Sequence, residues 1–116
     1  MADRVIFIGW NRAIAGREKQ AMQLFQKSME YYSKLQKDGK IESFEAVILA
    51  AHGGDLNGFI MLKGDANKLA EIREEDTFVE SSIEAGYCLD GLGIVSGYIG
   101  EGVAKAMTQW SKLIGR

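Results

Sequence analysis

The sequence predicts an α+β protein of the ferredoxin-like type, with strands and helices in the order βαββαβ and one further helix at the C-terminus. Three observations lead to this prediction. Four short runs are rich in β-branched and aromatic residues, helical stretches separate them, and a glycine-rich turn joins the middle two runs. The strands are apolar on both faces, which indicates that something must cover each side of the sheet.

The N-terminal part of the chain is expected to form one strand and one long helix. The run from Arg4 to Trp10 alternates apolar side chains between two faces and stops at a polar Asn-Arg pair. From Gly16 to Asp38 the apolar residues instead recur at steps of three and four, mostly with lysine, glutamine and glutamate between them. Gly39 should end this helix in a left-handed conformation.

The middle of the chain is expected to form a hairpin followed by a broken helical region. Ile41 to His52 and Phe59 to Lys63 should be antiparallel strands, because the turn GGDLNG between them is rich in residues that accept positive φ. A helix should then start at Asp65 or Asn67, with a break near residue 76.

The last part of the chain is expected to form a fourth strand and a short helix. Leu92 to Ile99 is the strand, interrupted by two glycines. The helix carries a narrow apolar stripe and should lie on an apolar surface; the stripe consists of Val103, Met107, Trp110 and Ile114. Without a long linker or repeat, residues 1–116 are predicted to form a single ferredoxin-like domain.

Charge and composition exclude several kinds of partner. Lys and Arg number 14 against 16 Asp and Glu, so the net charge of -2 provides no positive field for nucleic acid or anionic lipid. No apolar run approaches the roughly 20 residues that span a bilayer, and the N-terminus lacks a signal-peptide core. A lone cysteine cannot form an intramolecular disulfide, and together with the N-terminus it indicates a cytoplasmic protein. From the charge and the short apolar runs we expect no nucleic-acid and no membrane partner.

The element order, the two-faced strands, the broken second helix and the segment CLDGLGIVSGYIGEG resemble the dimeric α+β barrel superfamily. The resemblance covers nearly the whole chain. It implies a homodimer in which two four-stranded sheets pack face to face, forming a dimeric α+β barrel. Members of this superfamily include cofactor-free monooxygenases, haem-degrading enzymes, and EthD-like and YCII-related proteins, so the fold does not define one function.

Small monooxygenases of this superfamily often use Asn, Trp and His or Arg near a pocket between sheet and helices. The chain offers these residue types at Trp10, Asn11, Arg12 and His52. Their spacing matches no one subfamily, so no catalytic role is carried over from the resemblance.

Five residues are the candidates for ligand binding. Trp10, Asn11 and Arg12 combine an aromatic plane, an amide and a guanidinium, which suit a planar acidic ligand, although a core Trp followed by solvated loop residues is the favoured interpretation. His52 is the only histidine and could act as an acid or base, or could simply bond to the hairpin backbone. Tyr98 could direct its hydroxyl into a cavity or serve only in packing.

Other chemistry is not expected. One histidine and one cysteine supply too few ligands for a zinc site, and the glycines lack the spacing of a dinucleotide fingerprint, so neither a metal nor a cofactor is predicted. No GxSxG motif presents a serine nucleophile. Cys88 should be an inert buried thiol, and the run from Arg73 to Asp76 should be solvated surface.

The leading functional hypothesis is a dimeric α+β barrel that binds a small organic ligand between sheet and helices. The alternatives are a cofactor-independent monooxygenase, in which His52, Asn11 and Trp10 orient the substrate and oxygen, and a structural or regulatory dimer without activity. An RNA-recognition module is disfavoured because the segment NGFIMLKG has aliphatic residues where base-stacking rings belong. A pocket with room for a ring, lined by Trp10 and His52, would favour the first two hypotheses.

Overall fold

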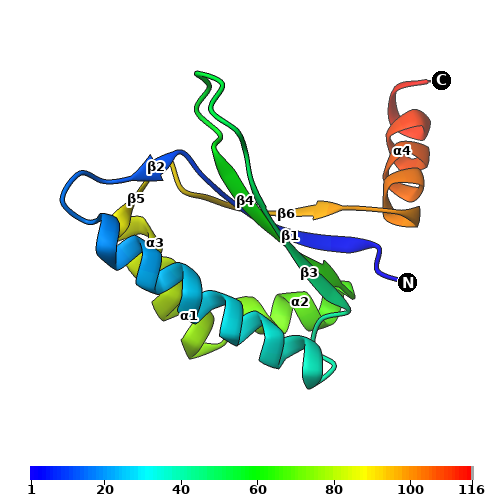
Figure 1. The fold of residues 1–116 in the computed structure, drawn as a ribbon. Helices are drawn as coiled ribbons and strands as arrows, with labels where there is room; N and C mark the ends of the chain where they lie inside the picture. Colours follow the sequence, from blue (N-terminus) through cyan, green and yellow to red (C-terminus); the bar gives the residue numbers. More distant parts are fainter. Residues whose placement is uncertain (116) are drawn as a thin grey trace.

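The computed structural model describes residues 1–115 and contains a four-stranded antiparallel sheet with helices packed on one face (Figure 1). The sheet has the order β3-β4-β1-β6, built from β1 (Arg4–Trp10), β3 (Ser43–Ile48), β4 (Gly58–Gly64) and β6 (Gly93–Tyr98). The packed helices are α1 (Glu18–Lys37), α2 (Ala66–Arg73) and α3 (Asp76–Cys88). This connectivity confirms the predicted α+β class and the βαββαβ order.

The strand register determines which side chains enter the core. Ile6 and Ile8 of β1 lie opposite Leu62 and Ile60 of β4, and all four are buried beneath the helices. Phe7, one position along, lies on the opposite face, where its ring stacks on Phe59 at a centroid distance of 5.1 Å. Both faces of β1 are therefore apolar, as predicted.

Several predicted boundaries are confirmed. The first strand covers Arg4–Trp10, α1 lies within the expected range, and Gly39 has a φ of +75°. Asp65 caps α2 by accepting a hydrogen bond from the Lys68 backbone nitrogen at 3.2 Å. The second helical region is broken as expected, at Glu74 and Glu75 between α2 and α3.

The predicted second strand is too long. It ends at Ile48, so His52 lies in the hairpin loop and not on the strand. Ala50, Ala51 and His52 are all exposed, and the His52 ring contacts the backbone of its own hairpin at Gly54 and Leu56.

A second, two-stranded sheet was not predicted. In it β2 (Arg12–Ala13) pairs with β5 (Leu89–Asp90), and the backbone nitrogen of Ile14 donates to the carbonyl of Cys88 at 2.9 Å. This small sheet fastens the segment after β1 to the end of α3. Two-residue strands have no periodicity that a sequence could display.

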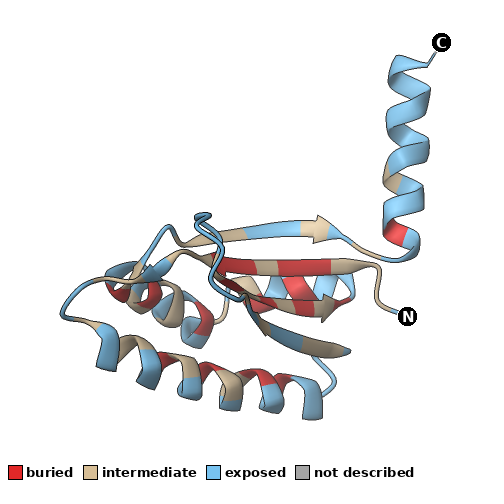
Figure 2. Ribbon diagram, turned by 45° about the horizontal axis from the view of Figure 1, so that its top comes forward, coloured by how far each residue is buried: buried red, intermediate tan, exposed pale blue. Residues whose placement is uncertain are grey.

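The C-terminal helix, α4 (Glu101–Ile114), exists, but its predicted packing is wrong within this chain. It stands away from the sheet and is exposed along nearly its whole length (Figure 2). Helices α1, α2 and α3 cover one face of the sheet, and α4 extends from the end of β6 without lying on either face (Figure 1). Its stripe consequently remains in contact with solvent in the single chain.

Candidate functional site

A cavity of about 280 Å³ lies between the sheet and helices α1 and α3. Its wall is mostly aliphatic and aromatic, and its sheet side is formed by Ile8, Trp10, Ile60 and Ile94. From the helices come Leu24, Phe25, Phe78 and Ala85, among others. An apolar hollow of this size with a few polar groups is the usual form of a small-molecule site.

The polar groups of the cavity are mainly hydroxyls. Ser28 and Tyr32 lie one helical turn apart on α1 and are both buried. Burial raises the pKa of Tyr32 to about 12, with the Ser28 side chain acting in the opposite direction. The Tyr32 hydroxyl is therefore neutral at physiological pH. Ser81 and Ser82 of α3 add two more hydroxyls, of which that of Ser82 donates to the Phe78 carbonyl at 2.8 Å.

The cavity reaches solvent near the start of α1 and the end of β3. Met22 and Ile48 both line it, yet they remain 66% and 67% exposed. Glu18, also exposed, is the one lining residue that carries a full charge at neutral pH, and it accepts a hydrogen bond from the Gly16 backbone nitrogen at 2.9 Å. Among residues 1–115, none of those that line the wall has a cationic side chain.

Trp10 is the sequence candidate that lines this cavity. It lies opposite Gly58 of β4, where a Cβ atom would come within 2.6 Å of the indole ring. Glycine at that position therefore lets the ring lie flat over the neighbouring strand. Phe25 then meets the indole edge-on, with ring centroids 6.3 Å apart.

Asn11 and Arg12 follow Trp10 in the chain but have other surroundings. The Asn11 side-chain oxygen accepts a hydrogen bond from the Asn57 amide at 2.7 Å, which ties the end of β1 to the hairpin. Arg12 is exposed, and its backbone lies opposite that of Asp90 in the small two-stranded sheet. Neither residue is part of the cavity wall.

His52 lies in the exposed hairpin loop, also outside the cavity wall. Its Nδ1 accepts a hydrogen bond from the Gly54 backbone nitrogen at 3.1 Å, while Nε2 lies 2.8 Å from the Leu56 carbonyl. A neutral imidazole with its proton on Nε2 satisfies both contacts. The histidine is thus bonded to its own hairpin, the alternative that the sequence left open.

Tyr98 is exposed at the end of β6 and does not line the cavity. The Arg4 guanidinium lies over its ring, 4.6 Å from the centroid. This arrangement matches the packing alternative for Tyr98. The five candidates are therefore not brought together, since they lie at the cavity, the hairpin loop, the small sheet and the end of β6.

Cys88 is fully buried, and burial is the main cause that raises the pKa of its thiol. This agrees with the prediction of an inert cysteine.

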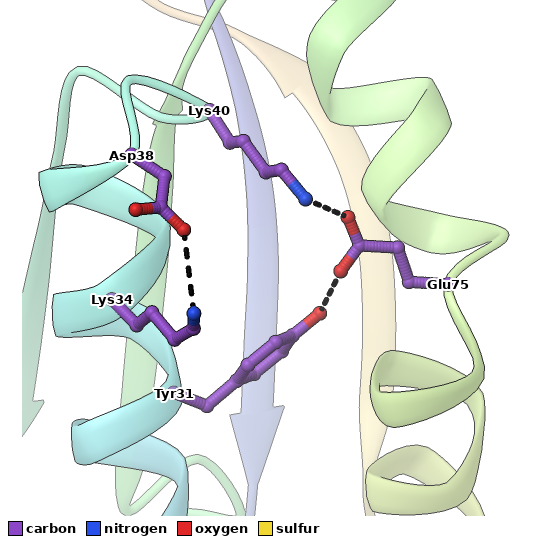
Figure 3. A network of polar contacts seen from close by, with 5 residues as sticks. All are labelled: Tyr31, Lys34, Asp38, Lys40 and Glu75. Carbon is purple, nitrogen blue, oxygen red and sulfur yellow. Dashed lines mark hydrogen bonds and ion pairs between the residues drawn. The ribbon is translucent and has the colours of Figure 1, made fainter.

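A second polar cluster joins α1 to the break between α2 and α3 (Figure 3). The Tyr31 hydroxyl donates to Glu75 at 2.7 Å, and the Lys40 ammonium lies 3.0 Å from the other carboxylate oxygen of Glu75. The Tyr31 hydrogen bond is the largest influence on Glu75 and lowers the pKa of its carboxyl. The prediction that residues 73–76 are simply solvated surface is therefore wrong for Glu75, which holds two elements together.

Within residues 1–115, no group of three or more His, Cys, Asp or Glu side chains is arranged to hold a metal ion. Over the same residues, none of the helices has the length and apolar character needed to cross a bilayer.

Comparison with known proteins places the chain by its fold. No family model and no curated protein sequence matches it. Solved structures do. A dimeric protein of unknown function and ferredoxin-like fold from Bacteroides fragilis is 10% identical, with a TM-score of 0.58 over 83% of this chain and 96% of that one. The chain has a ferredoxin-like fold.

Two further structures with this fold agree with the resemblance drawn from the sequence. An EthD family protein from Bacillus halodurans is 11% identical, with a TM-score of 0.58 over 84% of this chain and 99% of its own. SnoaB, a cofactor-independent oxygenase from Streptomyces nogalater, is 13% identical, with a TM-score of 0.51 over 85% of this chain and 93% of its own. At such identities the likeness establishes the ferredoxin-like fold alone.

Sequence reasoning missed most of the cavity wall of this ferredoxin-like protein. Phe25, Ser28 and Tyr32 follow one another at steps of three and four along α1, which the sequence shows only as the apolar face of a helix. The available signal was Ser28, a polar residue inside this apolar face. A polar side chain buried among apolar ones can mark a cavity that holds polar groups, and here Ser28 lies in the cavity wall with Tyr32.

Proposed function

We propose that this protein binds a small, uncharged, largely aromatic molecule in the cavity between the sheet and helices α1 and α3. The observation that carries the proposal is the cavity itself, an apolar hollow of about 280 Å³ that contains hydroxyl groups and opens to solvent. A protein with a purely structural role would be expected to fill this space with side chains, because protein interiors are normally packed to the density of organic crystals.

The size of the cavity suits a molecule of about two to three fused or linked rings. An apolar cavity of about 150 Å³ accommodates benzene, and this one is nearly twice as large. Trp10 and Phe25 offer ring surfaces against which a planar molecule can pack.

The chemistry of the wall favours a neutral ligand. A carboxylate or sulfonate would lose its hydration without gaining a cationic partner, at a cost of several kcal/mol. The hydroxyls of Ser28 and Tyr32 can instead exchange hydrogen bonds with a phenol or carbonyl group. This argument replaces the acidic ligand suggested by Arg12, because Arg12 lies outside the wall.

A matched pair of dyes tests the proposal. N-phenyl-1-naphthylamine is neutral, whereas 8-anilinonaphthalene-1-sulfonate has the same ring system with an added sulfonate. Fluorescence titration should give saturable binding of the neutral dye and an affinity for the anionic dye lower by about tenfold or more. Equal affinities, or no saturable binding of the neutral dye, would refute the proposed ligand class. Native mass spectrometry of the protein purified from cells would identify any molecule that it retains.

We also propose that the protein acts as a homodimer that joins two copies through the uncovered face of the sheet. The apolar part of this face consists of Phe7, Val47, Phe59, Met61 and Val95, all half-buried or exposed, and Glu45 and Lys63 form an ion pair of 3.2 Å on the same face. The similar protein from Bacteroides fragilis is described as dimeric, which supports the proposal. Light scattering at micromolar concentration should give twice the mass of the chain, and a monomer would refute this proposal alone.

A second candidate function is cofactor-independent oxygenation, which the fold similarity to SnoaB favours. In such a reaction the substrate itself must supply the electrons to oxygen. Of the residues suggested for this role, Trp10 lines the cavity, whereas Asn11 and His52 do not. Glu18 is the one carboxylate of the wall that could accept a substrate proton. Oxygen uptake with a two-ring hydroquinone, lost in Glu18→Gln but retained in His52→Ala, would support this function over simple binding.

A further inference from the structure

Helix α4 presents an apolar stripe that nothing covers in the single chain. Val103, Met107 and Trp110 are 46%, 53% and 56% exposed, and Ile114 continues the row. These residues are spaced by four, three and four positions, so they form one narrow line along the helix. A short helix of this kind is seldom stable in water unless its apolar face is packed.

The direction of α4 is fixed by its first turn. Gly100 has a φ of +54° at the start of the helix, and the Ile99 backbone nitrogen donates to the Asp3 carbonyl at 3.2 Å. A Cβ atom on Gly102 would collide with that same carbonyl, so the helix touches the N-terminal segment with no room for a side chain. The helix is therefore attached rigidly and is not a loose tail.

The fixed direction takes α4 toward the uncovered face of the sheet. In Figures 1 and 2 the helix rises from the end of β6 on the side opposite to α1, α2 and α3. That is the side on which Phe7, Phe59 and Val95 form the apolar surface of the proposed dimer. If a second copy packs on this surface, α4 of the first copy lies at the edge of the interface.

The charges of α4 favour a protein partner over a membrane. Lys105 and Lys112 are seven residues apart and lie on the side of the helix opposite to the stripe. With Glu101 beside them, they supply little attraction to anionic lipid. Leu113, 70% exposed, lies beside the stripe and widens the apolar face. An apolar face with its charges turned away fits the ridge-and-groove surface of another folded chain.

We propose that α4 is an arm that packs its stripe against a second copy of this chain. This inference rests on the proposed dimer and extends it, because each copy would hold the other at the uncovered sheet face and also along α4. The arm would bury Met107 and Trp110 in the assembled dimer, where they would add apolar contacts at the edge of the sheet-face interface.

The test compares two substitutions that make the same change on opposite sides of α4. Met107→Asp places a carboxylate in the stripe, and Lys105→Asp places one on the solvent side two residues earlier. Both variants should fold with unchanged circular dichroism and thermal midpoint at a concentration where the single chain dominates, since α4 contributes little to the core. Analytical ultracentrifugation should show the dimer dissociation constant raised by about tenfold or more in Met107→Asp and by less than about threefold in Lys105→Asp.

Tryptophan fluorescence gives a second measurement without an added charge. The difference between the spectra of the full-length protein and Trp110→Phe isolates the emission of Trp110. This emission should shift to longer wavelength when the dimer is diluted to single chains, because the ring then regains its exposure to water. A shift that is absent while the dimer dissociates would overturn the inference.

The outcomes separate the arm from the dimer. A dimer that both variants leave unchanged would refute the role of α4 and keep the sheet-face interface. A wild-type protein that stays a single chain would refute both. Sedimentation with vesicles of phosphatidylcholine and phosphatidylglycerol, lost in Met107→Asp while the dimer is unaffected, would overturn the inference in favour of a membrane partner.

Discussion

The cavity can be tested by filling it from within. Ala21 lies on α1 and lines the hollow, so Ala21→Leu would extend three further carbon atoms into empty space. Each buried methylene contributes about 0.8 kcal/mol, so the free energy of unfolding should rise by about 1–2 kcal/mol after the loss of side-chain entropy is included. The same substitution in a close-packed core would instead lower the free energy of unfolding by about 1–3 kcal/mol. The sign of the change therefore reports whether the space exists.

The assay combines urea unfolding with dye titration on the same samples. The matched control is Ala70→Leu, which makes the same change on an exposed position of α2 and should alter the free energy of unfolding by only a few tenths of a kcal/mol. The affinity of Ala21→Leu for N-phenyl-1-naphthylamine should fall by about tenfold or more, whereas Ala70→Leu should bind as the wild type does.

One result would refute this reasoning. If Ala21→Leu destabilises the protein by more than about 1 kcal/mol and binds the dye unchanged, the residue is close-packed and the dye binds elsewhere. Stabilisation without loss of binding would show that the space is real but is not the binding site.

Three further predictions concern residues around the cavity and the helix junction. Gly58→Ala should displace the Trp10 ring and weaken binding of the neutral dye, which titration and the shift in tryptophan emission would reveal. Because the pKa of Glu75 is lowered in the folded protein, its stabilising effect is complete above its ordinary pKa of 4.5 and is lost as pH falls through the folded value. Glu75→Gln should therefore cost about 1 kcal/mol at pH 7 and much less at pH 3 in urea unfolding, with Glu74→Gln as the exposed control. Cys88, fully buried and with a raised pKa, should react with a thiol reagent only in denaturant, and fast labelling of the folded protein would contradict this.

The sequence was sufficient for the main sheet because each of its four strands displays its own pattern. Arg4 to Trp10 alternates apolar residues between two faces, and the structure uses both, with Ile6 under the helices and Phe7 on the uncovered side. The helix from Glu18 to Lys37 likewise shows its period directly. Local patterns of this kind survive folding because burial follows them.

The candidate site was harder to predict because it depends on contacts between distant segments. Trp10 reaches the cavity only because Gly58 lies across from it, 48 positions later in the chain, and no local pattern connects the two. In the sequence, Glu75 is one of several consecutive acidic residues, and nothing near it indicates a partner. Its hydrogen bond with Tyr31 of α1 exists only in the folded chain. His52 is a candidate because it is the sole histidine, but both of its ring nitrogens contact the backbone of the hairpin.

The core consists of two packed clusters, and the cavity touches both. Ile8, Ile60 and Phe78 belong to the larger cluster, whereas Leu24 and Ala85 belong to a small one around Cys88. Separation of the end of α3 from the sheet would break the small cluster, the β2–β5 pairing and the contacts of Arg17 with Tyr87, while the larger cluster stays intact. Local opening of this kind would widen the entrance of the cavity without global unfolding. Amide hydrogens near residues 85–90 should consequently exchange faster than those of β1 and β4, and a bound ligand should slow them most.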